Sequence, residues 1–170
     1  MLAEFFQVAA HLEIERKFLV RQLPPGWRRN ASSQIVQGYF PTAGKELEIR
    51  LRRNGSQYFI TIKAGHGQRR LEQEIQIPEP TFRSLWPLTR TARIAKRRYT
   101  IPFRGHTIEV DVYQGPHRGL RTADIEFDSV RQSRSFEPPE WLGREITGSR
   151  RYANQVLARH QGLPRTRTIL

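Results

Sequence analysis

The chain has 170 residues, of which 29 are basic and 16 acidic, giving a net charge of +13 at neutral pH. This length supports one domain with a substantial core, and the absence of any apolar run near 18 residues excludes a transmembrane helix. The absence of cysteine excludes disulfides and thiolate metal sites, and it is consistent with a cytoplasmic protein. The positive charge favours anionic partners such as polyphosphate, nucleotides or nucleic acid.

Residues 1–11 lack the basic start of a signal peptide and carry Glu4, so we treat them as a leader whose order the sequence does not decide. From there on, apolar and charged side chains alternate in segment after segment, a pattern typical of β-strands. Asn54-Gly55 between two such segments predicts a hairpin. Eight strands are predicted, over residues 11–20, 34–40, 46–53, 58–63, 71–77, 94–101, 107–113 and 122–127.

Two helices are predicted between and after these strands. A short one covers residues 81–85, and a longer one covers 149–161, where Gly162 and Pro164 end it. Many strands joined by short turns indicate a mainly β (α+β) protein, with an antiparallel sheet folded into a barrel or sandwich. We expect one domain over residues 12–163, followed by a basic tail at 164–170. The five histidines fall mostly in turns or near chain ends, and we expect them to be exposed to solvent.

The charged faces of the predicted strands carry pairs of like charge at a spacing of two. Such neighbours repel, at about 2 kcal/mol per pair for roughly 7 Å and an effective dielectric near 20. They make sense if a ligand of opposite charge lies between them: a divalent cation for the acidic pairs and a polyanion for the basic pairs. Oxygen ligands of this kind suit Mg²⁺ or Mn²⁺. The pairs are Glu13/Glu15, Arg50/Arg52, Glu72/Glu74, Lys96/Arg98 and Asp124/Glu126.

The chain uses lysine only four times, against twenty-five arginines. Three of the four, Lys17, Lys63 and Lys96, fall on the charged strand faces. In a chain that otherwise uses arginine, this placement indicates that a compact point charge is needed there.

These segments together resemble the CYTH domain of the triphosphate tunnel metalloenzyme family, over about residues 12–158. The signature Glu-x-Glu-x-Lys is present as Glu13, Glu15 and Lys17, and six further motifs follow in the family's order. The chain departs from the family pattern at Asp124, where Glu is usual. The further motifs are Arg50-x-Arg52, Thr61-Ile-Lys63, Glu72-x-Glu74, Lys96-Arg-Arg98-Tyr99, Glu109-Val-Asp111 and Asp124-Ile-Glu126.

The resemblance implies an eight-stranded antiparallel β-barrel whose charged interior is a triphosphate tunnel, with peripheral helices and a C-terminal helix outside. It also implies binding of a triphosphate with divalent metal, so we expect a hydrolase that cleaves inorganic tripolyphosphate with Mg²⁺ or Mn²⁺, two ions per site. Substrate would be bound by Lys17, Arg50, Arg52, Lys63, Lys96 and Arg98. Metal would be bound by Glu13, Glu15, Glu72, Glu74, Asp111, Asp124 and Glu126, and the catalytic residues would be Glu74, Asp111, Lys96 and Tyr39.

Two alternatives stay open at this point. A thiamine triphosphatase or a class IV-type adenylate cyclase of the same fold would need a site for an organic group, built with Trp27 or Phe82. A non-enzyme could bind polyphosphate or nucleic acid through its external arginines, but nucleic-acid binders interleave aromatic and basic residues, whereas these faces alternate charge with charge. A homodimer is also left open.

Overall fold

The computed structural model describes residues 14–42, 47–66, 69–160 and 162–164. Three short α-helices and four 3-10 turns connect the strands of one sheet within these ranges. The helices are α1 (Glu79–Leu85), α2 (Val130–Ser135) and α3 (Asn154–Arg159), and the 3-10 turns are η1 (Trp27–Arg29), η2 (Trp86–Thr89), η3 (Gly115–His117) and η4 (Arg150–Tyr152). The strands are β1 (Ile14–Val20), β2 (Ser32–Tyr39), β3 (Leu47–Asn54), β4 (Gln57–His66), β5 (Arg69–Gln76), β6 (Arg93–Phe103), β7 (His106–Tyr113), β8 (Arg121–Phe127) and β9 (Leu142–Glu145).

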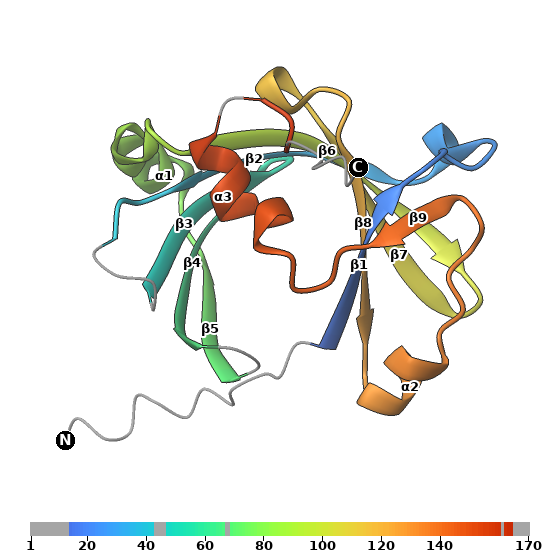
Figure 1. The fold of residues 1–170 in the computed structure, drawn as a ribbon. Coiled ribbons are helices and arrows are strands. Elements are labelled where there is room, and N and C mark those ends of the chain that lie inside the picture. The colour runs from blue at the N-terminus through green and yellow to red at the C-terminus, as the bar shows by residue number, and fades with distance from the viewer. Residues whose placement is uncertain (1–13, 43–46, 67–68, 161, 165–170) are drawn as a thin grey trace, which may run out of the picture.

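The sheet is antiparallel and strongly curved, with strand order β5-β4-β3-β2-β6-β7-β8-β1-β9. The eight predicted strands are all present, and β9 adds a short ninth strand at the β1 edge. Figure 1 shows the sheet bent around a central space, with β5 on one side and β1 on the other. In the described part of the chain no ladder joins β5 to β1 or β9, so the barrel-like sheet is open along that side.

The predicted Asn54-Gly55 hairpin is confirmed. Asn54 pairs with Gln57, so β3 and β4 are joined by a two-residue loop in which Gly55 adopts a positive φ of 59°. This left-handed backbone favours glycine because it has no side chain to clash. The tight loop sets the register that places the charged side chains of β3 and β4 on the same face.

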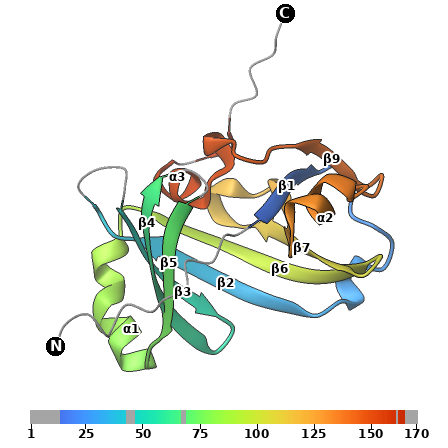
Figure 2. The same ribbon diagram turned by 90° about the horizontal axis from the view of Figure 1, so that it is seen from below.

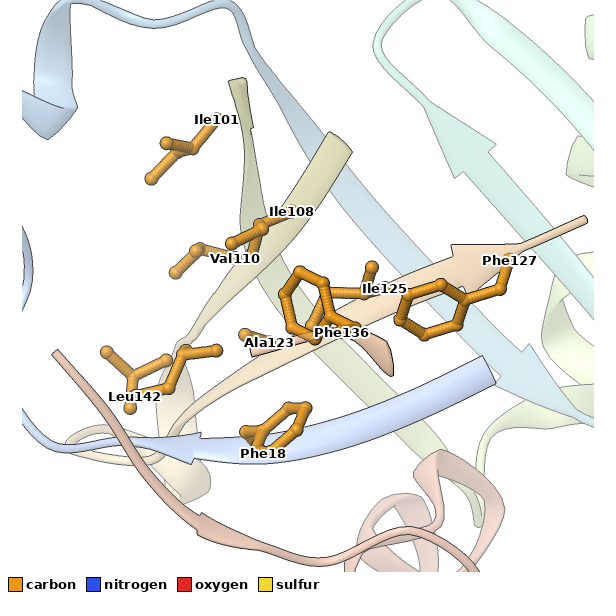
Figure 3. Packing of buried hydrophobic residues seen from close by; sticks show 10 residues of the cluster. Phe18, Ile101, Ile108, Val110, Ala123, Ile125, Phe127, Phe136 and Leu142 are labelled. Atoms are coloured by element: carbon orange, nitrogen blue, oxygen red, sulfur yellow. The ribbon is translucent and has the colours of Figure 1, made fainter. Parts of the chain in front are cut away.

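The main hydrophobic core lies on the outer face of β1, β6, β7 and β8 (Figure 3). Phe18 from β1 and Ile108 and Ile125 from the neighbouring strands are buried, and Phe136, which follows α2, packs onto them. Complete burial of such a side chain contributes about 1.5–3 kcal/mol. The apolar face of these strands therefore points outward under the peripheral elements, as predicted, and the polar face is left for the interior.

A second buried cluster fills one end of the sheet, beneath the C-terminal segment. Tyr39 of β2 and Tyr113 of β7 meet Ile146, Tyr152 and Leu157 there. In Figures 1 and 2, the segment that leads from β9 to α3 crosses the central space. The C-terminal segment is therefore part of the core and closes one end of the interior.

The predicted helix over residues 149–161 is shorter than expected. The backbone of Ala153 is extended, with φ −66° and ψ 131°, and it separates η4 from α3. The prediction that the histidines are exposed was wrong for His117, which is only 2% exposed. The predicted leader, and the predicted tail beyond residue 164, lie outside the described residues. No helix in the described ranges is both long and apolar enough to span a membrane.

Candidate active site

A cavity of about 900 Å³ occupies the space inside the curved sheet. Seven cations and eight carboxylates of the described residues line it, so opposite charges nearly balance despite the net charge of +13 for the chain. The prediction that the charged strand faces point inward is confirmed. The predicted site residues that line the cavity are Glu15, Lys17, Tyr39, Arg50, Arg52, Lys63, Glu72, Glu74, Lys96, Arg98, Asp124 and Glu126.

The wall formed by β1 and β8 brings together residues that are more than 100 positions apart in the sequence. Glu15 lies opposite Glu126, and Lys17 lies opposite Asp124. Because alternate residues of a strand share a face, all four side chains point into the cavity. The Lys17 Nζ donates a hydrogen bond of 2.7 Å to Asp124 Oδ1. Glu13, also predicted to bind metal here, lies outside the described residues.

The facing wall, formed by β3, β4 and β5, holds three cations and three glutamates, two of which, Glu72 and Glu74, pair with the cations. Arg50 Nη2 lies 3.6 Å from Glu72 Oε1, and Arg52 Nη1 lies 3.5 Å from Glu74 Oε2. Lys63 also pairs with Glu72. The Nε atoms of Arg50 and Arg52 are buried and have no hydrogen-bond partner among the described residues. Two donors of this wall are therefore buried without an acceptor among the described residues.

Asp111 does not line the cavity but lies beneath it, with no exposed surface. Its two oxygens accept bonds of 2.8 and 2.9 Å from Arg98, and Lys96 Nζ donates to it as well. Burial alone would raise the pKa of Asp111, but the adjacent Lys96 and Arg98 charges outweigh burial and hold the pKa well below its ordinary range. Asp111 is therefore a fixed anion that orients two cations.

Lys96 is the most deeply buried cation of the cavity, with 2% of its surface exposed. Burial lowers its pKa to about 8; the nearby Arg98 and Lys17 charges act in the same direction, while Asp111 opposes them. The pKa of Arg98 shifts in the opposite direction. Burial alone would lower this pKa, but the charges of Asp111 and Glu109 outweigh burial and raise it. Near neutral pH, Lys96 is a cation close to its proton-release range.

Tyr39 lines the cavity and is 1% exposed. Gln37 Nε2 donates a hydrogen bond of 2.6 Å to its hydroxyl oxygen. Burial raises the pKa of Tyr39 to about 12, against the opposing charge of Arg50. The phenol is therefore neutral and keeps a proton that it can donate into the cavity.

Four charged residues of the cavity were not among the predicted site residues: Glu48, Glu109, Asp128 and Arg150. Glu48 precedes Arg50 by two positions and Glu109 precedes Asp111 by two, so the strand alternation that revealed their neighbours also applied to them. Glu109 accepts a bond from Arg98. Arg150 lies on the C-terminal segment, outside the sheet, where no strand pattern could have revealed it.

The donor set of the β1–β8 wall fits a hard divalent cation. Glu15, Asp124 and Glu126 supply carboxylate oxygens on adjacent strands, and such oxygens are the ligands that Mg²⁺ and Mn²⁺ prefer. No three such groups among the described residues lie close enough together to hold a metal as they stand. Asp124 is instead paired with Lys17 and, at 3.6 Å, with Arg98.

The two aromatic residues considered for an organic ligand lie away from the cavity. Trp27 packs against Tyr99 at a ring distance of 4.4 Å, and Phe82 is buried between Tyr58 and Trp86. The aromatic residues that do line the cavity are at most 7% exposed: Tyr39, Phe127 and Tyr152. Within the described residues the cavity thus presents charged groups and little aromatic surface.

A family model, the CYTH domain, matches residues 11–156. The chain belongs to the CYTH domain family. The resemblance that its motifs indicated is thereby confirmed. The match spans the cavity-lining strands as well as residues 146–155 of the C-terminal segment.

This CYTH domain is 41% identical over 148 residues to an inorganic triphosphatase of Nitrosomonas europaea, covering 86% of this chain and 96% of that protein. It is 32% identical over 150 residues to an inorganic triphosphatase of Acetivibrio thermocellus, covering 87% and 94%. A crystal structure of an inorganic triphosphatase superposes with a TM-score of 0.70 at 38% identity, covering 88% of this chain and 96% of that one. A Pyrococcus horikoshii protein, with a TM-score of 0.51 and 18% identity over 72% and 82%, shares the fold.

Proposed function

We propose that this CYTH domain is a metal-dependent hydrolase that cleaves inorganic tripolyphosphate into pyrophosphate and orthophosphate. The observation that carries the proposal is the set of seven cations among the described residues, Arg50 and Arg52 included, that line one cavity. Donors in that position call for anionic oxygen acceptors. The similarity to two inorganic triphosphatases supports the same reaction.

The phosphate groups are bound by cations from both walls of the cavity. Arginine offers a planar set of donors that matches phosphate oxygens, whereas lysine supplies a point charge. Because these cations are distributed along the triphosphate, they stabilise the negative charge that develops on the leaving pyrophosphate. The proposed substrate-binding residues are Lys17, Arg50, Arg52, Lys63, Lys96 and Arg98.

A divalent cation, when bound, would supply charge neutralisation and a water of lowered pKa. Glu13, Glu15, Asp124 and Glu126 would hold one Mg²⁺ or Mn²⁺, and Glu72 and Glu74 would hold a second. Glu74 is the proposed group that positions the attacking water, since Thr61 Oγ1 donates a 2.7 Å hydrogen bond to one of its oxygens and orients it.

Asp111 is better placed to position other residues than to bind metal. Both of its oxygens are occupied by Lys96 and Arg98 beneath the cavity. We therefore assign it the role of fixing those two cations. Lys96 contacts the substrate, and the neutral Tyr39 donates its proton in a hydrogen bond to a phosphate oxygen.

The scarcity of exposed aromatic surface favours an inorganic substrate. Thiamine triphosphate and ATP carry rings that proteins commonly bind by stacking, and Trp27 and Phe82 are committed to packing elsewhere. A cytoplasmic location and a homodimer stay predictions.

The proposal is tested by measuring phosphate release from tripolyphosphate, thiamine triphosphate and ATP with Mg²⁺, with Mn²⁺ and with EDTA. We expect metal-dependent release that is fastest with tripolyphosphate, and a loss of at least about a hundredfold in Glu126→Gln, since a neutral amide is a weak metal ligand. Glu137→Gln, on the outer surface, is the matched control. Absence of release from all three compounds would overturn the hydrolase, and cyclic AMP formed from ATP would make it a cyclase.

A further inference from the structure

Arg150 differs from every other cation that lines the cavity. Six of the seven lining cations each have a carboxylate oxygen within 4.0 Å, from a strand one or two places away in the sheet. Arg150 has no side-chain partner within the described part of the chain, and it is exposed to solvent. It is therefore a cation at the rim of the cavity whose charge is not committed to the protein.

The backbone that carries Arg150 is anchored on both sides. Ile146 is 4% exposed and its N–H donates a 2.7 Å bond to the carbonyl oxygen of Lys17, while Tyr152 is 3% exposed in the second core cluster. Gly148 turns the chain with a φ of 70°, and Tyr152 N–H donates back to Ser149. In Figure 1 this anchored segment crosses in front of the central space between β9 and α3. The backbone position of Arg150 is thus fixed, and only rotations within its side chain can move the guanidinium.

We propose that Arg150 is a substrate-contacting residue that binds the outermost phosphate group of the polyphosphate at the cavity rim. This inference rests on the proposed function. The inner cations must exchange a carboxylate for the substrate, whereas Arg150 can bind phosphate without breaking an ion pair. Its fork of donors matches phosphate oxygens. We expect Arg150 to make this contact equally in the bound substrate and in the transition state, so it should lower KM and leave kcat nearly unchanged.

The test compares tripolyphosphate kinetics of the wild type, Arg150→Gln, Arg150→Lys and Arg159→Gln. Arg159 is the matched control, since it lies exposed on α3, does not line the cavity and loses the same charge. We expect Arg150→Gln to raise KM about tenfold with kcat within about twofold, the size of one charge-assisted contact. Arg150→Lys should recover part of the loss, and Arg159→Gln should match the wild type. A KM of Arg150→Gln equal to that of Arg159→Gln would overturn the proposal.

Folding and function are controlled separately. Thermal unfolding of Arg150→Gln should match that of Arg159→Gln, because neither side chain has a partner among the described residues. If the wild type releases no phosphate, the proposed function fails, and calorimetric titration with tripolyphosphate and Mg²⁺ tests Arg150 directly. Weaker binding by Arg150→Gln than by Arg159→Gln would then support the contact, while equal affinities or no binding by the wild type would overturn it.

Discussion

Asp111 and Glu137 both pair with basic residues, but in opposite surroundings. Asp111 has no exposed surface, whereas the Arg104–Glu137 pair, at 3.4 Å, has side chains that are 69% and 85% exposed. We expect Asp111→Asn to lower the free energy of unfolding by about 3–5 kcal/mol, because the buried Lys96 and the half-buried Arg98 lose their counter-charge. Glu137→Gln should change it by less than about 0.5 kcal/mol. Urea unfolding at pH 7 measures both, and equal effects would contradict this account.

Lys96 gives stability a particular dependence on pH. Its pKa of about 8 in the folded protein lies below the ordinary value of 10.5, so between these values the unfolded chain holds more protons. Stability of the wild type, relative to Lys96→Met, should therefore rise by about 3 kcal/mol from pH 8 to pH 10.5, since each pKa unit is about 1.4 kcal/mol. Urea unfolding of both proteins across this range measures the difference. A flat or falling difference would show that the ammonium is not destabilised by burial.

The sequence predicted which faces carry the site but not the depth of each residue. Alternation placed Lys96, Arg98 and Asp124 on charged strand faces, the resemblance implied that these faces line the interior, and the structure confirms this for all three. The alternation could not show that Asp111 lies beneath the cavity surface, because its burial depends on how the side chains of Lys96 and Arg98 on β6 cover it. It also missed Arg150, since position on a connecting segment follows from tertiary packing and not from a local pattern.

At the scale of elements, strands were predictable because their alternation repeats over several residues. The short β9 and α2 were not predicted, because four and six residues give too little periodicity. The helix over 149–161 was overextended, since its apolar positions fit a helical stripe although Ala153 is extended. The helix is interrupted because Tyr152 and Leu157, on either side of the extended Ala153, both pack into the second core cluster.

The contact of β2 with η2 leaves no room for a side chain at Gly38. A Cβ built there would lie 2.3 Å from Thr89 Oγ1 and 3.0 Å from a ring carbon of Trp86. We expect Gly38→Ala to lower the free energy of unfolding by about 1–3 kcal/mol through overpacking. It should also disturb Gln37 and Tyr39 on the same strand. Thermal unfolding measures the loss.

A second substitution tests the cause. Adding Thr89→Ala to Gly38→Ala removes the nearest atoms, so the double variant should lose less stability than the sum of the two single variants. Strictly additive losses would show that the clash with Thr89 is not the reason.

For the whole molecule, the net charge of +13 opposes the compact state by self-repulsion. Raising the ionic strength from about 10 to 150 mM shortens the Debye length from about 30 Å to about 8 Å. We therefore expect the urea midpoint at pH 7 to increase with NaCl, and KCl to act equally if the effect is screening. A midpoint that falls with salt would mean that internal ion pairs, and not the outer charge, dominate.

The pairing of six cavity cations with carboxylates has one more consequence. On the proposed function the interior would act as an ion exchanger: the cations would bind the anionic oxygens of a metal polyphosphate, and the displaced carboxylates would bind its metal. The number of ion pairs is then nearly the same before and after binding, and few small counterions leave with the exchange. Affinity for the metal complex should consequently depend on salt far less than a chain of this net charge would suggest.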